Sequence, residues 1–335
     1  MESIFSWPGV GKKMAVDAIN YRDYPVIQGY VVWMALIFLV INFAVDASYQ
    51  SLIREYGKGW KRMDKKRKSR IWLIVSLILL LLLFVAAFGG EKWLHHAPFK
   101  PDMRHAFQKP CLEYPFGTDN LGRCVFCRII KGSRTSIFSA LFVVLIVFTV
   151  GTLLGTAAGF VGGIWENIIM KITLIFQAFP SFILAVAIAG ILGNGVINGV
   201  LSLCAVYWTT YCRLARSLTV SLREVPYMKA AKVCGAGKPA ILFRYILPNV
   251  MPSLLVTAAL DVGSVILSMA GLSFLGLGAV RPTAEWGAVM SEAKDYLQTA
   301  PWIIVFNGIA LFVVVTVFNL LGDSLRDLLD TEAEM

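Results

Sequence analysis

The chain has 335 residues, of which 57% are hydrophobic and only 16% are charged, and its formal net charge is +10. Its mean hydropathy is +0.69. A soluble domain of this length cannot bury so much apolar side chain, so the composition excludes an ordinary soluble protein and predicts a membrane protein. The basic residues form no patch interleaved with aromatic residues, which argues against a nucleic-acid partner.

Seven apolar stretches are long enough to cross a bilayer, which takes roughly 20 residues of helix. In chain order they cover about residues 26–48, 71–89, 135–163, 168–192, 196–215, 248–275 and 301–321. Helices are expected because backbone in lipid must satisfy its own hydrogen bonds. The sequence therefore predicts an all-α polytopic membrane protein, with a six-span core from 71 to 321 and one extra N-terminal span.

Basic residues beside the spans predict the orientation of the chain. Nine of them lie between residues 49 and 70, and seven lie between residues 213 and 247. Both loops are therefore expected in the cytoplasm. The loop from 90 to 134 then falls outside, and since it carries eight basic residues against four acidic ones, we expect it to lie on the membrane surface. The stretch before the first span does not have the order of a signal peptide.

The cysteines are scattered over loops and spans and form no disulfide framework. Cys124 and Cys127 make a C-x-x-C pair in the same loop as all three histidines of the chain. A zinc or redox role is the lesser alternative, because no second ligand pair accompanies the cysteines at zinc spacing. No metal site is predicted, and the pair is expected to supply small side chains to a partly buried helix.

Two helical patterns indicate packing rather than chemistry. Leu121, Val125 and Ile129 recur at spacing four while Arg123 and Arg128 lie mostly elsewhere. This pattern predicts an interfacial amphipathic helix over 119–134, with an ordinary surface helix as the alternative. The second pattern is a glycine every four residues, at Gly151, Gly155, Gly159 and Gly163. These positions share one helix face and should let another helix approach closely.

Polar residues inside spans are functional candidates by default. Asp261 is the clearest, followed by Gln177 beside Pro180, which is expected to kink the span 168–192 and line a pathway. The alternative for Asp261 is a hydrogen bond between helices. A membrane-embedded enzyme would need paired carboxylates, a serine with a base or a metal, and the spans carry only isolated polar residues. No catalytic residue is therefore predicted.

A polar and basic segment, residues 216–247, separates two of the apolar stretches. Within it Pro226 can start a helix, Ala230 and Ala231 leave room for a partner, and Gly235 can end the helix. We expect a short helix on the membrane surface that fits a groove of a partner. The run GAGKP at 235–239 is not a phosphate-binding loop, which reads G-x-x-x-x-G-K-[ST], so the chain is not expected to bind ATP.

This segment resembles the cytoplasmic loop of ABC importer permeases, which reads Glu-Ala-Ala, three residues, Gly, a spacer and Ile-Leu-Pro. The matching positions are Lys229, Ala230, Ala231, Gly235, Ile246, Leu247 and Pro248. Lys229 stands where the family has a glutamate, which puts any salt bridge made by that glutamate in doubt. The resemblance implies that these residues form the site where an ATPase docks.

The blocks 115–136, 271–302 and 318–330 narrow the resemblance to the C-type subunit of dipeptide, oligopeptide and nickel importers, over about residues 60–330. It implies a type I ABC importer permease fold in the cell membrane and no cofactor in this chain. It also implies a B-type permease partner, two ATPase subunits that bind ATP and magnesium, and an extracytoplasmic substrate-binding protein. Peptides are the expected cargo, with nickel or another small solute as the alternative. Many relatives carry an acidic residue where this chain has Met269.

The N-terminal part, residues 1–57, resembles the tail of the B-type subunit, with one transmembrane helix. The expected organisation is this tail, a basic cytoplasmic linker over 58–70 and a C-type domain over 71–330, with the docking loop at 216–247. The tail is a natural fusion, a split partner or a frameshift product, and the sequence leaves these open. A secondary transporter using Asp261 and a non-functional fusion remnant are the remaining alternatives.

Overall fold

A computed structural model of the chain describes residues 65–90 and 96–333, together with the single positions 25, 29 and 36. The chain divides into two compact units, residues 1–67 and 68–335, and nearly all described residues belong to the second. The expected span 26–48, the segment 1–57 and most of the linker 58–70 lie outside the described residues. Every regular element that the described residues form is a helix.

The principal helices are, in chain order, α3 (Lys65–Gly89), α4 (Val125–Val161), α5 (Gly163–Gln177), α6 (Ser181–Leu192), α7 (Val196–Arg223), α8 (Pro226–Val233), α9 (Lys238–Ala240), α10 (Leu247–Phe274), α11 (Trp286–Ala293) and α12 (Pro301–Ala333). A π-helical turn, Ile241–Ile246, leads from α9 into α10. Short 3₁₀ turns lie at Met103–His105 and Lys294–Tyr296.

Four helical segments of the described chain are long and apolar enough to cross a membrane: Ser69–Gly89, Val125–Val161, Lys238–Phe274 and Pro301–Leu329. The count rises to five if α5 and α6 form one broken span. The sequence predicted six spans from residue 71 onward. The helix that does not qualify is α7, because tyrosine, tryptophan and threonine side chains at 207–211 and then Arg213 lower its hydropathy. It packs against α4, α6 and α10, so much of its surface faces other helices rather than lipid.

The expectation of one kinked helix over 168–192 is corrected by the structure. α5 ends at Gln177 and α6 begins at Ser181, and their axes differ by 86°. Pro180 precedes α6 with extended backbone, at φ −55° and ψ 122°. Proline has no N–H to donate and disfavours helical backbone in the residue before it, which explains why the helix breaks here rather than bends.

The glycine pattern on α4 does bring two helices together. A Cβ on Gly151 would lie 2.5 Å from the Trp208 carbonyl oxygen, and one on Gly159 would lie 2.9 Å from the Arg216 carbonyl oxygen. Gly155 abuts the backbone of Cys212 in the same way. The prediction is confirmed for these three glycines. Gly163 instead begins α5 with φ +66° and faces open space.

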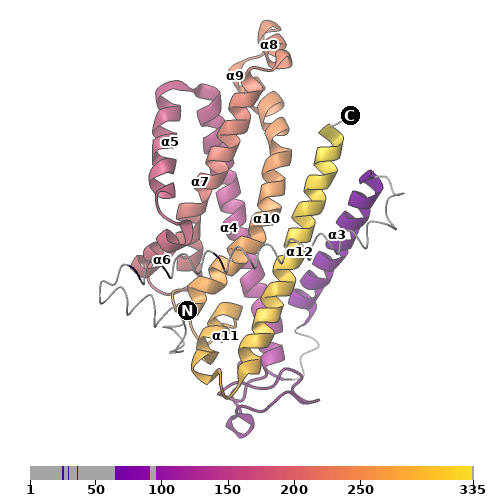
Figure 1. Cartoon of the computed structure of the whole chain (residues 1–335), viewed down its shortest axis with the longest axis vertical. Coiled ribbons are helices and arrows are strands. Elements are labelled where there is room, and N and C mark those ends of the chain that lie inside the picture. Colours follow the sequence, from indigo (N-terminus) through magenta and orange to yellow (C-terminus); the bar gives the residue numbers. More distant parts are fainter. Residues whose placement is uncertain (1–24, 26–28, 30–35, 37–64, 91–95, 334–335) are drawn as a thin grey trace. The chain divides into compact units, whose positions relative to one another are not determined.

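The second unit has two distinct ends. Figure 1 shows α8 and α9 at one end, and α11 with the loop that precedes α4 at the opposite end. We call residues 96–124 the cap. Backbone hydrogen bonds hold the cap together, including Asp102 N–H to Leu121 O at 2.9 Å and Phe107 N–H to Asp119 O at 3.0 Å. Between the two ends lies an apolar core to which α4, α7 and α10 contribute most of the buried side chains.

The predicted interfacial helix over 119–134 is wrong. Its residues from Val125 onward form the beginning of α4, and Val125 and Ile129 are buried. Arg123 and Arg128, which were expected away from the apolar side, are also buried. The period-four pattern was real, but the helix is enclosed by the cap and α11 rather than lying on a membrane surface.

Candidate functional site

The candidate site is α8, the eight-residue helix that the sequence predicted. Pro226 is its first residue, where the missing N–H costs nothing because that donor would have no helical acceptor. The helix ends in a left-handed cap: Gly235 has φ +85°, and the Ala236 N–H donates to the Ala231 carbonyl at 3.0 Å. Open space surrounds the position of a Cβ at Gly235, so the backbone conformation and not steric room requires glycine there.

The two alanines of the docking motif lie in different surroundings. Ala231 is buried, and Met228 one turn earlier is 1% exposed and belongs to the main apolar core. Ala230 and Lys229 are exposed, and Val233 is 88% exposed. Ala231 therefore anchors α8 to the bundle, while Ala230 leaves a shallow outer face that a partner can approach.

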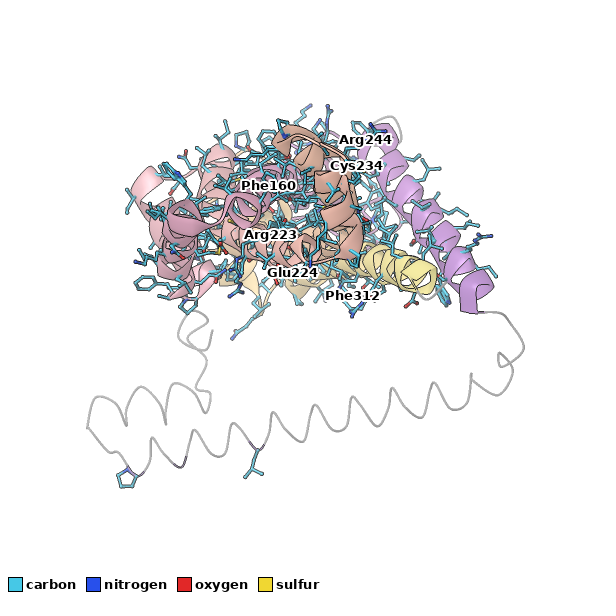
Figure 2. All side chains as sticks on the ribbon, turned by 90° about the horizontal axis from the view of Figure 1, so that it is seen from above. Phe160, Arg223, Glu224, Cys234, Arg244 and Phe312 are labelled. Carbon is cyan, nitrogen blue, oxygen red and sulfur yellow. The ribbon has the colours of Figure 1, made fainter. Side chains whose placement is uncertain are left out.

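The outer surface around α8 is basic. Lys229, Lys238 and Arg244 are exposed, and Glu224 supplies the one carboxylate among the described residues 224–247. Lys229 Nζ lies 3.9 Å from Glu224, but both side chains are mostly exposed, so this pair adds little stability. Figure 2 looks down on the bundle from above and labels Arg223, Glu224, Cys234 and Arg244, which lie in or beside the segment 223–244 that contains α8.

The final part of the motif connects α8 to α10. Ile246 is fully buried and ends the π-helical turn, and Leu247 and Pro248 form the first turn of α10. Pro248 is exposed. Ile241, Ile246 and Met228 share the same apolar cluster. A displacement of α8 would therefore be transmitted through packed side chains to the start of α10.

The candidate pathway residues are not brought into one site. Asp261 is half-buried on α10 and lies beside Tyr211 of α7. The Tyr211 hydroxyl is buried and makes no hydrogen bond of standard geometry to the described residues. Gln177 ends α5, and its buried Oε1 has no hydrogen-bond partner among the described residues. Pro180 is exposed in the break before α6. No hydrogen bond or ion pair among the described residues joins Asp261 to Gln177. Their role in a pathway stays a prediction.

A buried charge cluster at the opposite end was missed by the sequence reasoning. Arg128 Nη1 lies 2.6 Å from Asp119 Oδ2 and 3.0 Å from Glu292 Oε2. Arg123 also reaches both carboxylates, with Nε 2.7 Å from Asp119 and Nη2 2.7 Å from Glu292. Arg281 approaches Glu292 at 3.3 Å from the exposed side. The cluster ties the cap to α4 and to α11.

The electrostatics of this cluster favour the charged carboxylate. Burial alone would raise the pKa of Glu292, but the hydrogen bond and charge of Arg128, together with Arg123, outweigh burial and lower that pKa. Nearby, Glu285 caps α11 by accepting from the Ala288 N–H at 2.9 Å. Burial raises the pKa of Glu285. The i, i+4 pair Asp119–Arg123 was the one local signal in the sequence, since Glu292 is 164 residues from Arg128.

The described residues hold no group of three histidine, cysteine or carboxylate side chains placed to bind a metal. Cys124 and Cys127 lie together at the start of α4. His96 and His105 flank the Tyr114 ring, with centroid distances of 4.6 and 5.6 Å. The third histidine, His95, lies outside the described residues.

Comparison with known families decides what this helical membrane chain is. The model of a family described as "Binding-protein-dependent transport system inner membrane component" matches residues 1–58 and 151–334. The chain belongs to this family. The family and the apolar helices together make it a multi-pass permease of the inner membrane. It is a transport component rather than an enzyme.

Individual relatives of this permease agree with the family match. It is 38% identical over 262 residues to the nickel transport system permease protein NikC of Escherichia coli, covering 78% of this chain and 95% of NikC. It is 38% identical over 271 residues to the dipeptide transport system permease protein DppC of Alkalihalophilus pseudofirmus, covering 81% and 89%. It is 39% identical over 262 residues to the probable D,D-dipeptide transport system permease protein DdpC of Escherichia coli, covering 78% and 86%.

Proposed function

We propose that the permease is the C-type subunit of an ATP-driven importer for di- or oligopeptides, and that α8 is the element on which a separate ATPase subunit docks. The observation that supports this most directly is the two-sided character of α8. One side is anchored in the core through Met228 and Ala231, and the other presents Ala230 on an exposed, basic surface. This is the arrangement that a rigid surface element needs to transmit force from a partner.

The proposed assembly contains a B-type permease, two ATPase subunits that bind ATP and magnesium, and an extracytoplasmic substrate-binding protein. In it α8 faces the cytoplasm and the cap faces the outside, because basic residues gather around α8. The separate family match over residues 1–58 supports the proposal that this segment derives from the tail of a B-type subunit. The basic outer surface of α8 predicts a docking groove with acidic residues on the ATPase.

The proposed mechanism is alternating access. ATP binding draws the two ATPases together and displaces α8, and the π-helical turn passes this displacement to α10, which carries Asp261. Hydrolysis of ATP by the partner subunits then resets the cavity. In this scheme the permease contributes coupling and a path for the substrate, and the ATPase subunits contribute the chemistry.

Peptides are favoured as cargo because relatives named for dipeptide and D,D-dipeptide transport align over most of this chain. Nickel is the second candidate, since NikC aligns over 95% of its own length. Uptake assays in membrane vesicles with the cognate binding protein separate the two cargoes. Dependence of uptake on ATP, with insensitivity to a proton uncoupler, separates an importer of this kind from a secondary transporter that uses Asp261.

The docking role is tested by substituting the outer alanine. Ala230→Trp fills the exposed face of α8, so we expect the ATPase subunits to dissociate and substrate-stimulated ATP hydrolysis to be lost, with the thermal stability of the permease unchanged. Leu112→Trp is the matched control, because Leu112 is fully exposed in the cap at the other end. Wild-type coupling in the Ala230→Trp complex would contradict the proposal.

A further inference from the structure

The C-x-x-C pair sits where the cap joins α4, and its geometry is that of a reactive dithiol. Cys124 is the N-cap of α4, and its Sγ accepts a hydrogen bond from the Cys127 backbone N–H at 3.4 Å. The two thiols also share a hydrogen bond. Both cysteines are free and buried. Two thiols in contact within one helical turn need little movement to form a disulfide.

A cavity borders one of the two cysteines. It has a volume of about 580 Å³ and is lined by cap residues that include Lys100, Arg104, Tyr114 and Cys124. Cys127 is not among its lining residues. An incoming reagent therefore meets Cys124 first, beside two cationic side chains, while Cys127 lies behind it in the first turn of α4.

The surroundings of Cys124 stabilise its thiolate. The hydrogen bond from the Cys127 thiol lowers the pKa of Cys124 to about 7. The backbone N–H groups of Phe126 and Cys127 at the start of α4 favour the same charged form, whereas burial and the charge of Asp119 oppose it. The lowered pKa favours the nucleophilic thiolate of Cys124, which is the form that separates reactive cysteines from inert buried ones.

We propose that Cys124 and Cys127 form a redox-active pair that exchanges with small-molecule disulfides, with Cys124 as the attacking thiol and Cys127 as the resolving thiol. The Cys124 thiolate attacks one sulfur of the disulfide RSSR, forms a mixed disulfide and releases RS⁻. Cys127 then loses its proton and attacks Cys124 Sγ, which releases the second RS⁻. In sum, two protein thiols are oxidised to one disulfide and RSSR is reduced to two thiols.

The position of the pair gives this chemistry a structural consequence. Cys124 Sγ caps the helix that carries Arg128, and Arg128 pairs with Asp119 of the cap. A disulfide between Cys124 and Cys127 would lock the junction between the cap and α4 on the side that the proposed orientation exposes to an oxidising environment. The exchange itself does not depend on which cargo the permease carries.

One peptide reports the state of the pair. Trypsin cleaves after Arg123 and after Arg128, so both cysteines are released in the single peptide CVFCR. The full-length permease is solubilised in detergent micelles, so that glutathione reaches both of its ends. It is equilibrated with mixtures of reduced and oxidised glutathione, quenched with acid, alkylated and analysed by mass spectrometry. Cys234, exposed near α8 at the other end, is the internal control for access of the reagent.

We expect CVFCR to convert to its internal disulfide as oxidised glutathione increases, and to return to the dithiol with dithiothreitol. Cys127→Ser should trap glutathione on Cys124, whereas Cys124→Ser should leave Cys127 unmodified. The proposal is overturned if CVFCR stays a dithiol across the series while Cys234 becomes glutathionylated. Glutathione on Cys127 in the Cys124→Ser variant, with none on Cys124 in Cys127→Ser, would overturn the assignment of the attacking thiol.

Discussion

Replacement of Arg128 by methionine tests whether the buried charge cluster holds the cap to the bundle. The Arg128 side chain is fully buried, and those of Asp119 and Glu292 are 5% and 9% exposed. Arg128→Met leaves these two carboxylates with Arg123 as their one buried cation. An uncompensated buried charge costs about 3–5 kcal/mol. Arg128 Nε and Nη2 already lack hydrogen-bond partners among the described residues, so we expect the lower end, about 3 kcal/mol.

Two further variants separate charge imbalance from lost packing. Arg128→Met combined with Glu292→Met restores a balance of one buried cation and one buried anion, because Arg123 keeps Asp119 at 2.7 Å. We expect this double variant to recover most of the lost stability, since apolar replacements of buried ion pairs are often neutral. Arg216→Met is the control for a partly exposed pair, with Glu166, and should cost at most about 1 kcal/mol.

The assay is the free energy of unfolding in a denaturant titration, with hydrogen exchange of the cap amides as the local readout. Exchange at Phe107 and Gly122, whose N–H groups both donate to the Asp119 carbonyl, should accelerate in Arg128→Met and not in Arg216→Met. A loss below about 1 kcal/mol in Arg128→Met would refute the reasoning, because it would mean that water reaches the carboxylates. A double variant less stable than Arg128→Met would refute the charge-balance argument.

The remaining predictions concern pH, helix packing and the end of α8. The folded-state pKa of Glu292 lies below its usual 4.5. Its contribution to stability is therefore complete above pH 4.5 and is lost as the pH falls through the lower folded-state pKa. Glu292→Gln should flatten this part of a plot of melting temperature against pH. Gly155→Ala should cost about 1–3 kcal/mol in thermal unfolding, because its Cβ meets the Cys212 backbone, whereas Gly190→Ala faces open space and should not destabilise. Gly235→Val should reduce ATPase coupling by straining a left-handed backbone at about 1–2 kcal/mol, while Gly235→Asn should retain most of it.

Local chemistry explains what could be predicted from the sequence. Hydropathy located the helices that now form the bundle, because lipid requires long apolar runs. Pro226 and Gly235 marked the start and end of α8 correctly, since each acts through the backbone of its own position. The spacing of Gly151 and Gly159 predicted a close helix contact for the same reason: a face without side chains can be read from spacing alone.

What escaped prediction depends on the partner of each segment. The pattern over 119–134 correctly indicated a helix from Val125 onward. Periodicity does not show what covers the polar side of that helix, and here Glu292 comes from a distant part of the chain. Pro180 predicted a disturbance of the helix but not the angle of that disturbance, because an 86° break requires that both α5 and α6 find packing partners of their own. Likewise, Ala230 and Ala231 are adjacent and chemically identical, and only the packing of Met228 shows which of them faces the core.

The position of α10 connects the two ends of the permease. It begins at Leu247, directly after the π-helical turn beside α8, and ends at Phe274. Near its far end Ala270 packs against the backbone of Gly287, at the start of α11, so closely that a Cβ on Gly287 would lie 2.6 Å from the Ala270 Cα.

Because α10 is held at both ends, it cannot absorb a displacement of α8 by sliding. It must either move as a rigid body together with α11 and the cap, or bend at Pro252, the proline inside its first turns. Pro252→Ala discriminates between these motions, because it restores the helical hydrogen bond at position 252 without changing the outer face of α8. Retained coupling in that variant would favour the rigid-body motion, whereas lost coupling with intact ATPase binding would favour the bend.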